Sequence, residues 1–195
     1  MTYFNLREFL SAFVILFAII DITGSIPIFL RLRSCGKTIN PARCSIASLF
    51  IFLGFLYVGE GILDLFKIDF SSFAIAGSLI LFVYAAEMIM DIEIFKSSPN
   101  TPNDATYVPV AFPLIAGAGA LTTLLSIRSQ YSSFNIILAI LCNIVFVYIV
   151  LRLTEKISKI LNPAVIYCLQ KFFGIILLAI SVKLFVTNLT VLVGK

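Results

Sequence analysis

Four ionisable side chains lie within long apolar segments of the sequence: Asp21, Glu60, Glu87 and Lys183. On insertion scales an ionised side chain at the centre of a bilayer costs at least about 2.5–3.5 kcal/mol, so such residues usually face the bundle interior or water and often carry function. Asp21 and Lys183 each lie about twelve residues into their segments, and we expect both near the middle of a membrane. Glu60 and Glu87 lie closer to segment ends, where a side chain can reach the interface, so a structural role is the simpler expectation for them.

The chemistry available to Asp21 depends on its partner. An unpaired carboxylate at mid-membrane can bind a substrate ammonium group or carry a proton, which makes Asp21 a candidate for substrate binding and for ion coupling. Alternatively, Asp21 and Lys183, or Glu60 and Lys183, neutralise each other and only fix the packing of helices. The sequence leaves both roles open.

The segment DITGSIPIFL (21–30) contains residues that interrupt a helix. Gly24 can end one half-helix, Ser25 can cap the next, and Pro27 suits a first turn, where its missing N–H has no partner to lose. A break here leaves backbone N–H and C=O groups unpaired at mid-depth, which is tolerable only where protein or a water-filled cavity satisfies them. The pattern therefore predicts a functional interruption of the first span.

A second interruption is predicted in AGAGALTT (116–123). Gly117 and Gly119 supply backbone flexibility, while Thr122 and Thr123 supply hydroxyl groups. If both half-helices restart near mid-membrane, the positive ends of their dipoles point toward a shared centre, where a carboxylate binds well. With the aspartate of the first break nearby, such a site suits a zwitterion. The alternative is that these small residues only let helices approach closely.

The elements that position these residues are predicted from composition. The chain has 195 residues, 61% hydrophobic side chains and a mean hydropathy of +1.09, which is typical of an integral membrane protein. Its apolar runs match the roughly 20 residues that a helix needs to cross hydrocarbon, so we predict an all-α membrane protein. The six expected transmembrane helices are 9–32, 45–66, 73–90, 108–127, 134–153 and 171–193, with the fourth broken by prolines and glycines.

The two halves of the chain resemble each other. The segment IAGSLILFVYAAEMI (75–89) is similar to FFGIILLAISVKLFV (172–186), with Gly77 and Gly174 in register. Three helices in each half make the second half enter the membrane from the opposite face, so the repeat is inverted, an arrangement typical of transporters. We predict one membrane domain over 1–195, composed of a first repeat (1–90), a connecting loop (91–107) and a second repeat (108–195).

The distribution of basic residues predicts the orientation. The N-terminus, the second and fourth connections and the C-terminus hold only Arg7, Lys67, Arg128 and Lys195, whereas the other three connections hold nine basic residues. Because basic residues favour the cytoplasmic side, both termini are expected outside the cytoplasm. Basic residues dispersed over several connections also argue against a nucleic-acid partner. The nine residues are Arg31, Arg33, Lys37, Arg43, Lys96, Arg152, Lys156, Lys159 and Lys171.

Metal, redox and enzymatic chemistry find little support. The chain contains no histidine, and its four cysteines have no CxxC spacing, so neither a zinc site nor a disulfide relay is expected. No serine or cysteine has a histidine base, which argues against an enzyme. We expect no metal and no cofactor, and four free thiols: Cys35, Cys44, Cys142 and Cys168.

At the two predicted breaks the chain resembles the MarC family of six-helix membrane proteins, a group that includes neutral amino acid transporters. The resemblance covers nearly the whole length, in the order and spacing of four segments: FAIIDITGSIPIFL (17–30), FAIAGSLILF (73–82), VPVAFPLIAGAGALTT (108–123) and FFGIILLAISVKLF (172–185). It implies a bacterial inner-membrane protein of two three-helix repeats, and for some members of the family transport of small neutral amino acids is inferred.

The chain departs from the family pattern in both halves. The first family motif is Asp-Pro-x-Gly-x-x-Pro, of which Asp21, Gly24 and Pro27 are present while Ile22 replaces the first proline. The second is Gly-Pro-Gly-Ala, in which Ala118 replaces the proline between Gly117 and the glycine and alanine at 119 and 120. In addition, a lysine stands at 183 where relatives would have a glutamine. These changes put the family's substrate and rate in doubt for this chain.

The sequence therefore predicts a secondary transporter or exporter of small neutral amino acids or related metabolites, embedded in the lipid bilayer. Its substrate-binding residues would be Asp21, Gly24, Ser25, Pro27, Gly117, Gly119, Thr122 and Thr123, and its charge-pair or ion-coupling residues Asp21, Glu60 and Lys183. The alternative is a membrane protein without transport activity, in which the broken helices and an Asp21–Lys183 pair are structural.

Overall fold

The computed structural model describes residues 4–20, 22, 25–92, 104–128, 130–160 and 162–194, without the side chains of residues 27, 158–160 and 163. The secondary structure of these described residues is helical apart from one isolated bridge between Thr38 and Asp104. Its elements are α1 (Leu6–Ile20), α2 (Ile26–Ser34), α3 (Pro41–Leu65), α4 (Phe70–Met90), η1 (Thr106–Ile115), α5 (Ala118–Arg128), α6 (Ser133–Ile160) and α7 (Pro163–Val193).

Four helices of the described part are each long and apolar enough to cross a membrane: α3, α4, α6 and α7. A fifth candidate span is the pair η1 and α5, whose axes are bent by 49° at a short break. The predicted first span is divided between α1 and α2, each too short to cross alone. The helices therefore end and restart at both predicted interruptions, while the six-span arrangement stays a prediction.

Two predicted spans were too short. We expected 134–153 and 171–193, whereas α6 continues to Ile160 and α7 begins at Pro163. Helix α6 continues beyond its apolar stretch with polar residues, whereas the extra residues at the start of α7, PAVIYCLQ (163–170), are mostly apolar and belong to the same candidate span. Asn162 caps the start of α7 by accepting a hydrogen bond from the Ala164 N–H at 3.1 Å, which fixes the start of the helix at Pro163.

Side-chain caps define several other helix starts. Asn40 accepts from the Arg43 N–H at 3.1 Å and precedes Pro41, which occupies the first position of α3. Asp69 accepts from the Ser72 N–H at 2.8 Å at the start of α4. Because these caps satisfy donors that the helix cannot satisfy itself, they fix the residues at which the long helices begin.

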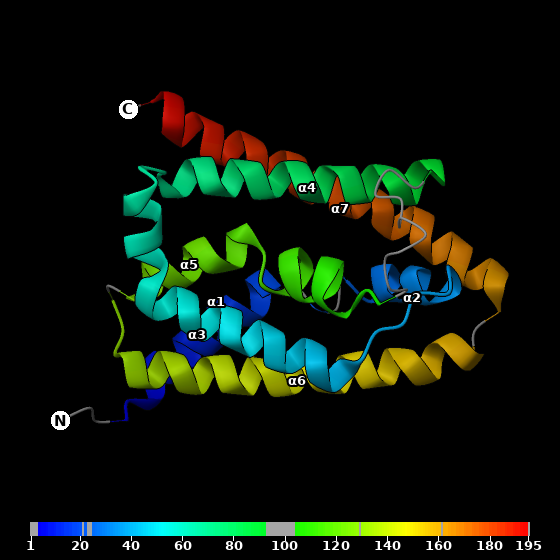
Figure 1. Cartoon of the computed structure of the whole chain (residues 1–195), viewed down its shortest axis with the longest axis horizontal. Helices are drawn as coiled ribbons and strands as arrows, with labels where there is room; N and C mark the ends of the chain where they lie inside the picture. The colour runs from blue at the N-terminus through cyan, green and yellow to red at the C-terminus, as the bar shows by residue number, and fades with distance from the viewer. Residues whose placement is uncertain are drawn as a thin grey trace.

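The long helices surround the broken ones (Figure 1). Helix α4 packs along α7 at one side, and α6 lies at the opposite side, where it packs against α1 and α3. The pair η1 and α5 crosses the middle of the bundle, in contact with α3 and α4. The chain begins and ends at the same, left-hand end of the molecule in this view.

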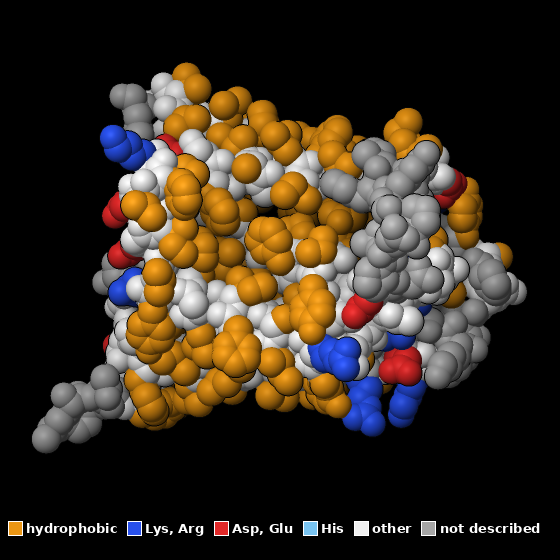
Figure 2. Space-filling model, in the orientation of Figure 1, with side chains coloured by type: hydrophobic (Ala, Val, Ile, Leu, Met, Phe, Trp, Pro, Cys, Tyr) orange, Lys and Arg blue, Asp and Glu red, His pale blue; other side chains and the backbone are white. Residues whose placement is uncertain are grey.

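The hydrophobic core includes both broken regions. Fully buried side chains from α1, α2, α3 and α6 meet those of η1 and α5 in one cluster, which includes Leu16, Phe29, Phe52, Ile115 and Ile140. Outside this core, large apolar side chains cover the long sides of the molecule, and Figure 2 shows the charged ones mainly at its two ends. An apolar belt between charged ends is what a bilayer requires of a spanning protein.

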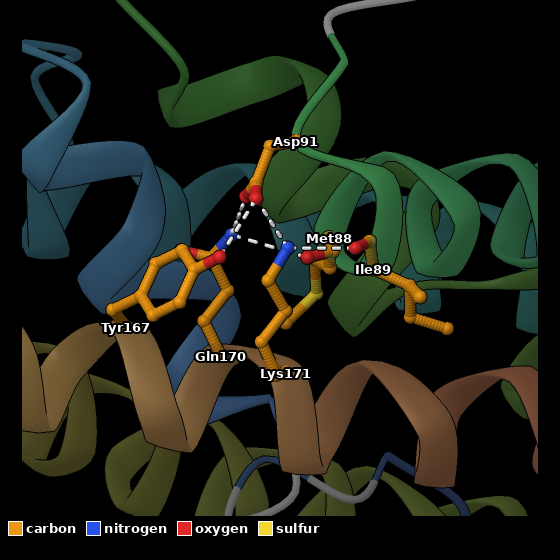
Figure 3. Close-up of polar contacts among 6 residues, drawn as sticks. All are labelled: Met88, Ile89, Asp91, Tyr167, Gln170 and Lys171. Atoms are coloured by element: carbon orange, nitrogen blue, oxygen red, sulfur yellow. Dashed lines mark hydrogen bonds and ion pairs between the residues drawn. The ribbon is translucent and has the colours of Figure 1, made fainter.

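Polar contacts join the ends of the helices. At the left-hand end, Glu8 accepts hydrogen bonds from the Asn135 side chain at 2.8 Å and the Ser132 N–H at 3.2 Å, which joins α1 to α6. At the other end, Lys171 of α7 forms an ion pair with Asp91, the residue that ends α4 in a left-handed conformation (Figure 3).

Further contacts complete the cluster at Asp91. The Tyr167 hydroxyl donates to Asp91 Oδ2 at 3.0 Å, and Lys171 Nζ donates to the Ile89 carbonyl at 2.6 Å (Figure 3). Lys171 thus donates a hydrogen bond to a carbonyl in the last turn of α4, where the helix dipole favours a cation. The hydrogen bond from Lys171 lowers the pKa of Asp91 below its ordinary value. The four cysteines are free, as expected.

Candidate functional site

The first break lies between the end of α1 at Ile20 and the start of α2 at Ile26. Asp21 and Gly24 lie outside the described residues, so their predicted roles stay predictions. Ile20 and Ile22, which flank the aspartate in sequence, are 4% and 2% exposed. The chain therefore passes through the interior of the bundle on both sides of that residue.

Ser25 occupies the cap position of α2, but not in the expected way. Its carbonyl accepts hydrogen bonds from the N–H groups of Ile28 and Phe29 at 3.1 and 3.2 Å. Its side chain makes no capping bond, so that detail of the prediction is wrong. The physical reason is its backbone, since φ of −82° and ψ of −10° are helical whereas capping side chains usually need an extended residue. Pro27 lies in the first turn, as predicted.

The second break has two causes. Val108 and Phe112 have extended backbone angles inside η1, and each precedes a proline, which disfavours the helical region for the residue before it. Ala116 and Gly117 then separate η1 from α5. Gly117 is required by space, because a Cβ there would lie 2.4 Å from the carbonyl oxygen of Pro113. Its own carbonyl accepts from the Leu121 N–H at 3.0 Å and so starts α5.

The two threonine hydroxyl groups of α5 that the sequence selects differ in whether they are free to contact a ligand. Thr122 donates to the Gly119 carbonyl at 3.1 Å, within its own helix. Thr123 is partly buried, and its hydroxyl has no hydrogen-bond partner in the described part of the chain. Gly119 lies where α5 faces α7, because a Cβ there would be 3.7 Å from a Leu184 methyl group. Thr123 is therefore the better candidate for a ligand contact.

The two restarted helices leave the middle of the bundle in opposite directions. In Figure 1, α5 runs from the middle to the left-hand end and α2 runs toward the right-hand end. Residues next to both breaks belong to the same buried cluster, among them Ile22, Ile28, Ala116 and Ala120. The starts of α2 and α5, which carry the positive ends of their dipoles, are therefore both within the buried core.

The ionisable residues of the spans occupy different surroundings. Glu60 lies near the end of α3 and pairs with Arg128 at 3.6 Å, with its side chain 52% exposed. This contact contradicts the idea that Glu60 neutralises Lys183. Glu87 is buried in α4 at 8% exposure, consistent with a structural role.

Lys183 is exposed, on the face of α7 opposite to the buried Gly174 and Ser181. It has no ion-pair partner among the described residues. Because Asp21 lies outside them, the Asp21–Lys183 pair stays a prediction.

Two residues that sequence reasoning did not select contribute to this region. Asn143 is 2% exposed in the middle of α6, and its Nδ2 donates to the Phe13 carbonyl of α1 at 3.3 Å. Gly77 of α4 faces the first residue of α5, since a Cβ there would lie 2.3 Å from Ala118 Cβ. A lone amide in an apolar span is the sequence signal that marks Asn143. The glycine contact joins segments 41 positions apart, and no local pattern reveals it.

The sequence profile of the MarC family integral membrane proteins matches residues 6–193. The chain belongs to this family. The match spans both broken regions and all the long helices, so the resemblance noted at the two motifs extends over the whole fold. No solved structure matches the chain.

Relatives with the same coverage occur in bacteria and archaea. A UPF0056 membrane protein of Buchnera aphidicola from Schizaphis graminum is 28% identical over 190 residues, covering 94% of this chain and 97% of the relative. A UPF0056 membrane protein of Methanocaldococcus jannaschii is 28% identical over 199 residues, covering 95% and 97%. The UPF0056 inner membrane protein YhgN of Escherichia coli K12 is 28% identical over 194 residues, covering 94% and 97%.

Proposed function

We propose that this MarC family protein is a secondary transporter or exporter of small neutral amino acids or related small metabolites. One observation carries the proposal: two interrupted helical paths restart at α2 and α5, and both restarts lie within the buried core. Helix breaks inside a bundle leave backbone N–H and C=O groups without helical partners, and the packing of an apolar core does not require such breaks. Paired breaks of this kind are the usual place of substrate sites in transporters.

The packing of the helices supports a six-span inverted repeat. The first broken path packs against the middle and last helices of the second half, because α1 and α2 contact α6, and α2 contacts α7. The second broken path does the reverse, since η1 and α5 contact α3 and α4. A two-fold relation in the membrane plane exchanges these contacts in this way. The division into repeats over 1–90 and 108–195 rests on this correspondence.

The chemistry favours a zwitterionic substrate. The N–H groups that begin α2 and α5 have no helical partners and favour a carboxylate. Asp21 follows directly on the buried end of α1 and would receive the ammonium group, with Thr123 as a neutral contact. Because Glu60 pairs with Arg128 near the end of α3, Asp21 is the better candidate of the two carboxylates for proton coupling. The protein would need no cofactor or metal.

Location and orientation follow from the relatives and the charges. YhgN is named an inner membrane protein, and we infer the same membrane for this chain. The described basic residues at the end where α1 starts and α7 ends are Arg7, Lys67 and Arg128. The opposite end has more of them, which supports our proposal that both termini lie outside the cytoplasm.

The test is uptake of labelled small neutral amino acids into proteoliposomes, with and without an imposed proton or sodium gradient. Asp21→Asn should abolish gradient-driven flux. Asp64→Asn is the matched control, because Asp64 is an exposed carboxylate near the end of α3 and should leave flux unchanged. Flux that survives Asp21→Asn would remove the aspartate from the mechanism, and no flux of any substrate by folded protein would reject the amino acid assignment.

The structural alternative makes a different prediction. If Asp21 and Lys183 only neutralise each other, the double variant Asp21→Asn with Lys183→Gln should behave as the wild type, while each single variant is destabilised. If Asp21 binds substrate or protons, the double variant should be as inactive as Asp21→Asn alone.

A further inference from the structure

A polar cavity lies at the end of the bundle opposite to the chain termini, remote from the helix breaks. It has a volume of about 640 Å³ and is lined by the end of α2, the α2–α3 loop, the start of α3, Asp104 and Glu155 of α6. This volume is in the range of small-molecule sites, roughly 300–1,000 Å³. Its charged lining consists of Arg33, Lys37 and Arg43 together with the two carboxylates.

Hydrogen bonds between residues 38–40 and residues 104–106, which we call the clasp, hold the wall of the cavity. The Ala105 N–H donates to the Thr38 carbonyl at 2.9 Å, and the Asn40 N–H donates to the Thr106 hydroxyl at 2.9 Å. Asp104 Oδ1 accepts from the Thr106 N–H at 2.9 Å. The α2–α3 loop is therefore fixed in position, and the cavity is a built feature of the fold.

Three basic side chains and two carboxylates line this cavity, and one carboxylate, Glu155, interacts electrostatically with Arg33. Arg33 donates through Nη2 to the Ile39 carbonyl at 3.1 Å, but its buried Nε has no hydrogen-bond partner. In the described part of the chain, no hydrogen bond or ion pair engages Lys37 Nζ or the Arg43 guanidinium. One oxygen of Asp104, by contrast, is occupied by the clasp. A buried donor without a partner is costly, which suggests that a ligand satisfies it.

The backbone adds to this preference. Helix α3 is 25 residues long and starts at Pro41, which lines the cavity. The N-terminus of such a helix carries partial positive charge and favours an anion. Arginine guanidinium groups match the geometry of phosphate oxygens especially well. Figure 2 shows basic side chains gathered beside the apolar belt at this end of the molecule, which is the depth of lipid phosphates.

We propose that this cavity binds a phosphate-type oxyanion, contacted by Arg33, Lys37 and Arg43 at the start of α3. The anion is either the headgroup of an anionic phospholipid or a soluble phosphate compound, which present the same chemistry. The site is separate from the helix breaks, so the proposal stands or falls independently of transport.

The test compares two double variants with the same change in net charge. Lys37→Gln with Arg43→Gln removes cations that line the cavity, whereas Arg152→Gln with Lys156→Gln removes exposed cations of α6 at the same end that do not line it. Binding of phosphatidylglycerol to delipidated protein is measured by native mass spectrometry, with phosphatidylcholine as the neutral lipid. Binding of inorganic phosphate is measured by calorimetry, and circular dichroism verifies that all proteins are folded.

We expect the wild type to bind phosphatidylglycerol in preference to phosphatidylcholine, with an affinity at least about tenfold lower in the cavity variant and nearly unchanged in the α6 variant. Binding of inorganic phosphate with the same dependence would show that soluble phosphate also enters, and its absence would assign the site to lipid. Equal losses in the two double variants, or no preference for an anion in the wild type, would overturn the proposal.

Discussion

Replacing Gly77 by alanine should force α4 and α5 apart at the start of α5. The added Cβ would lie 2.3 Å from Ala118 Cβ, whereas carbon atoms in contact prefer about 3.5–4.0 Å. The two helices must therefore separate by about 1.2–1.7 Å, the difference between those distances, or the alanine backbone must shift. Overpacking of this kind typically costs about 1–3 kcal/mol.

The same geometry predicts a specific rescue. After the Ala118 methyl, the next nearest atoms to the new Cβ are the Ala118 Cα and N, both at 3.5 Å, which is ordinary contact. Ala118→Gly should thus remove the clash, at a cost of its own of up to about 1 kcal/mol for glycine in a helix. The double variant should be more stable than Gly77→Ala alone, with a coupling of at least about 1 kcal/mol.

The assay is denaturant-induced unfolding in mixed micelles, followed by circular dichroism because the chain contains no tryptophan. Gly54→Ala is the control, since a Cβ at Gly54 meets nothing within 4 Å and the substitution should be neutral or slightly stabilising. If the effects of Gly77→Ala and Ala118→Gly simply add, the close approach of α4 and α5 is not the cause, and the reasoning fails. If the helix break is the transport site, Gly77→Ala should also lower flux, and the double variant should restore it.

Three further predictions follow from other contacts. Gly117→Ala should destabilise the protein by about 1–3 kcal/mol, because its Cβ would lie 2.4 Å from a carbonyl oxygen, while Gly119→Ala, with its nearest neighbour at 3.7 Å, should not; equal effects in unfolding experiments would contradict this. The pKa of Asp91 is lowered by its hydrogen bond with Lys171, so the ionised form stabilises the fold above pH about 4 and the stabilisation is lost at lower pH. The difference in melting temperature between wild type and Asp91→Asn should therefore shrink between pH 6 and pH 3, and a constant difference would exclude this role. Glu60→Gln breaks an ion pair of 3.6 Å with a 52% exposed carboxylate, so unfolding should show a change below about 1 kcal/mol, and a larger loss would indicate a further partner.

Local chemistry explains what could be predicted at the breaks. Prolines at 109 and 113 force the residues before them out of the helical region, and Gly117 permits a contact that a side chain would block. Pro27 occupies the first turn of α2 for the same local reason. The side-chain cap expected of Ser25 failed because its backbone is helical, a property that surrounding packing can impose on a residue without a strong preference.

The predicted charge pairs show the limit of such reasoning. Depth within a span can be counted along a sequence, and by depth alone Glu60 was a possible partner for Lys183. Which face of a helix turns inward depends on its neighbours. In the structure Glu60 forms its ion pair with Arg128, and Lys183 lies on the side of α7 opposite to its buried face. The polar cavity was missed altogether, since residues from three separate stretches of the sequence line it: 33–43, Asp104 and Glu155.

The sequence by itself determined the membrane class, the approximate helices and the two places where helices break. These properties depend on hydrophobic length and on glycine and proline, whose effects reach only a few residues along the chain. Only the tertiary structure decided that α4 meets α5 at Gly77, that Asn143 bonds to α1, and that the basic residues between the end of α2 and the start of α3 meet Asp104 and Glu155 around one cavity. Lipid is as apolar as the helix surfaces, so hydrophobicity does not select partners within a membrane, and close fit and hydrogen bonds between distant segments decide them instead.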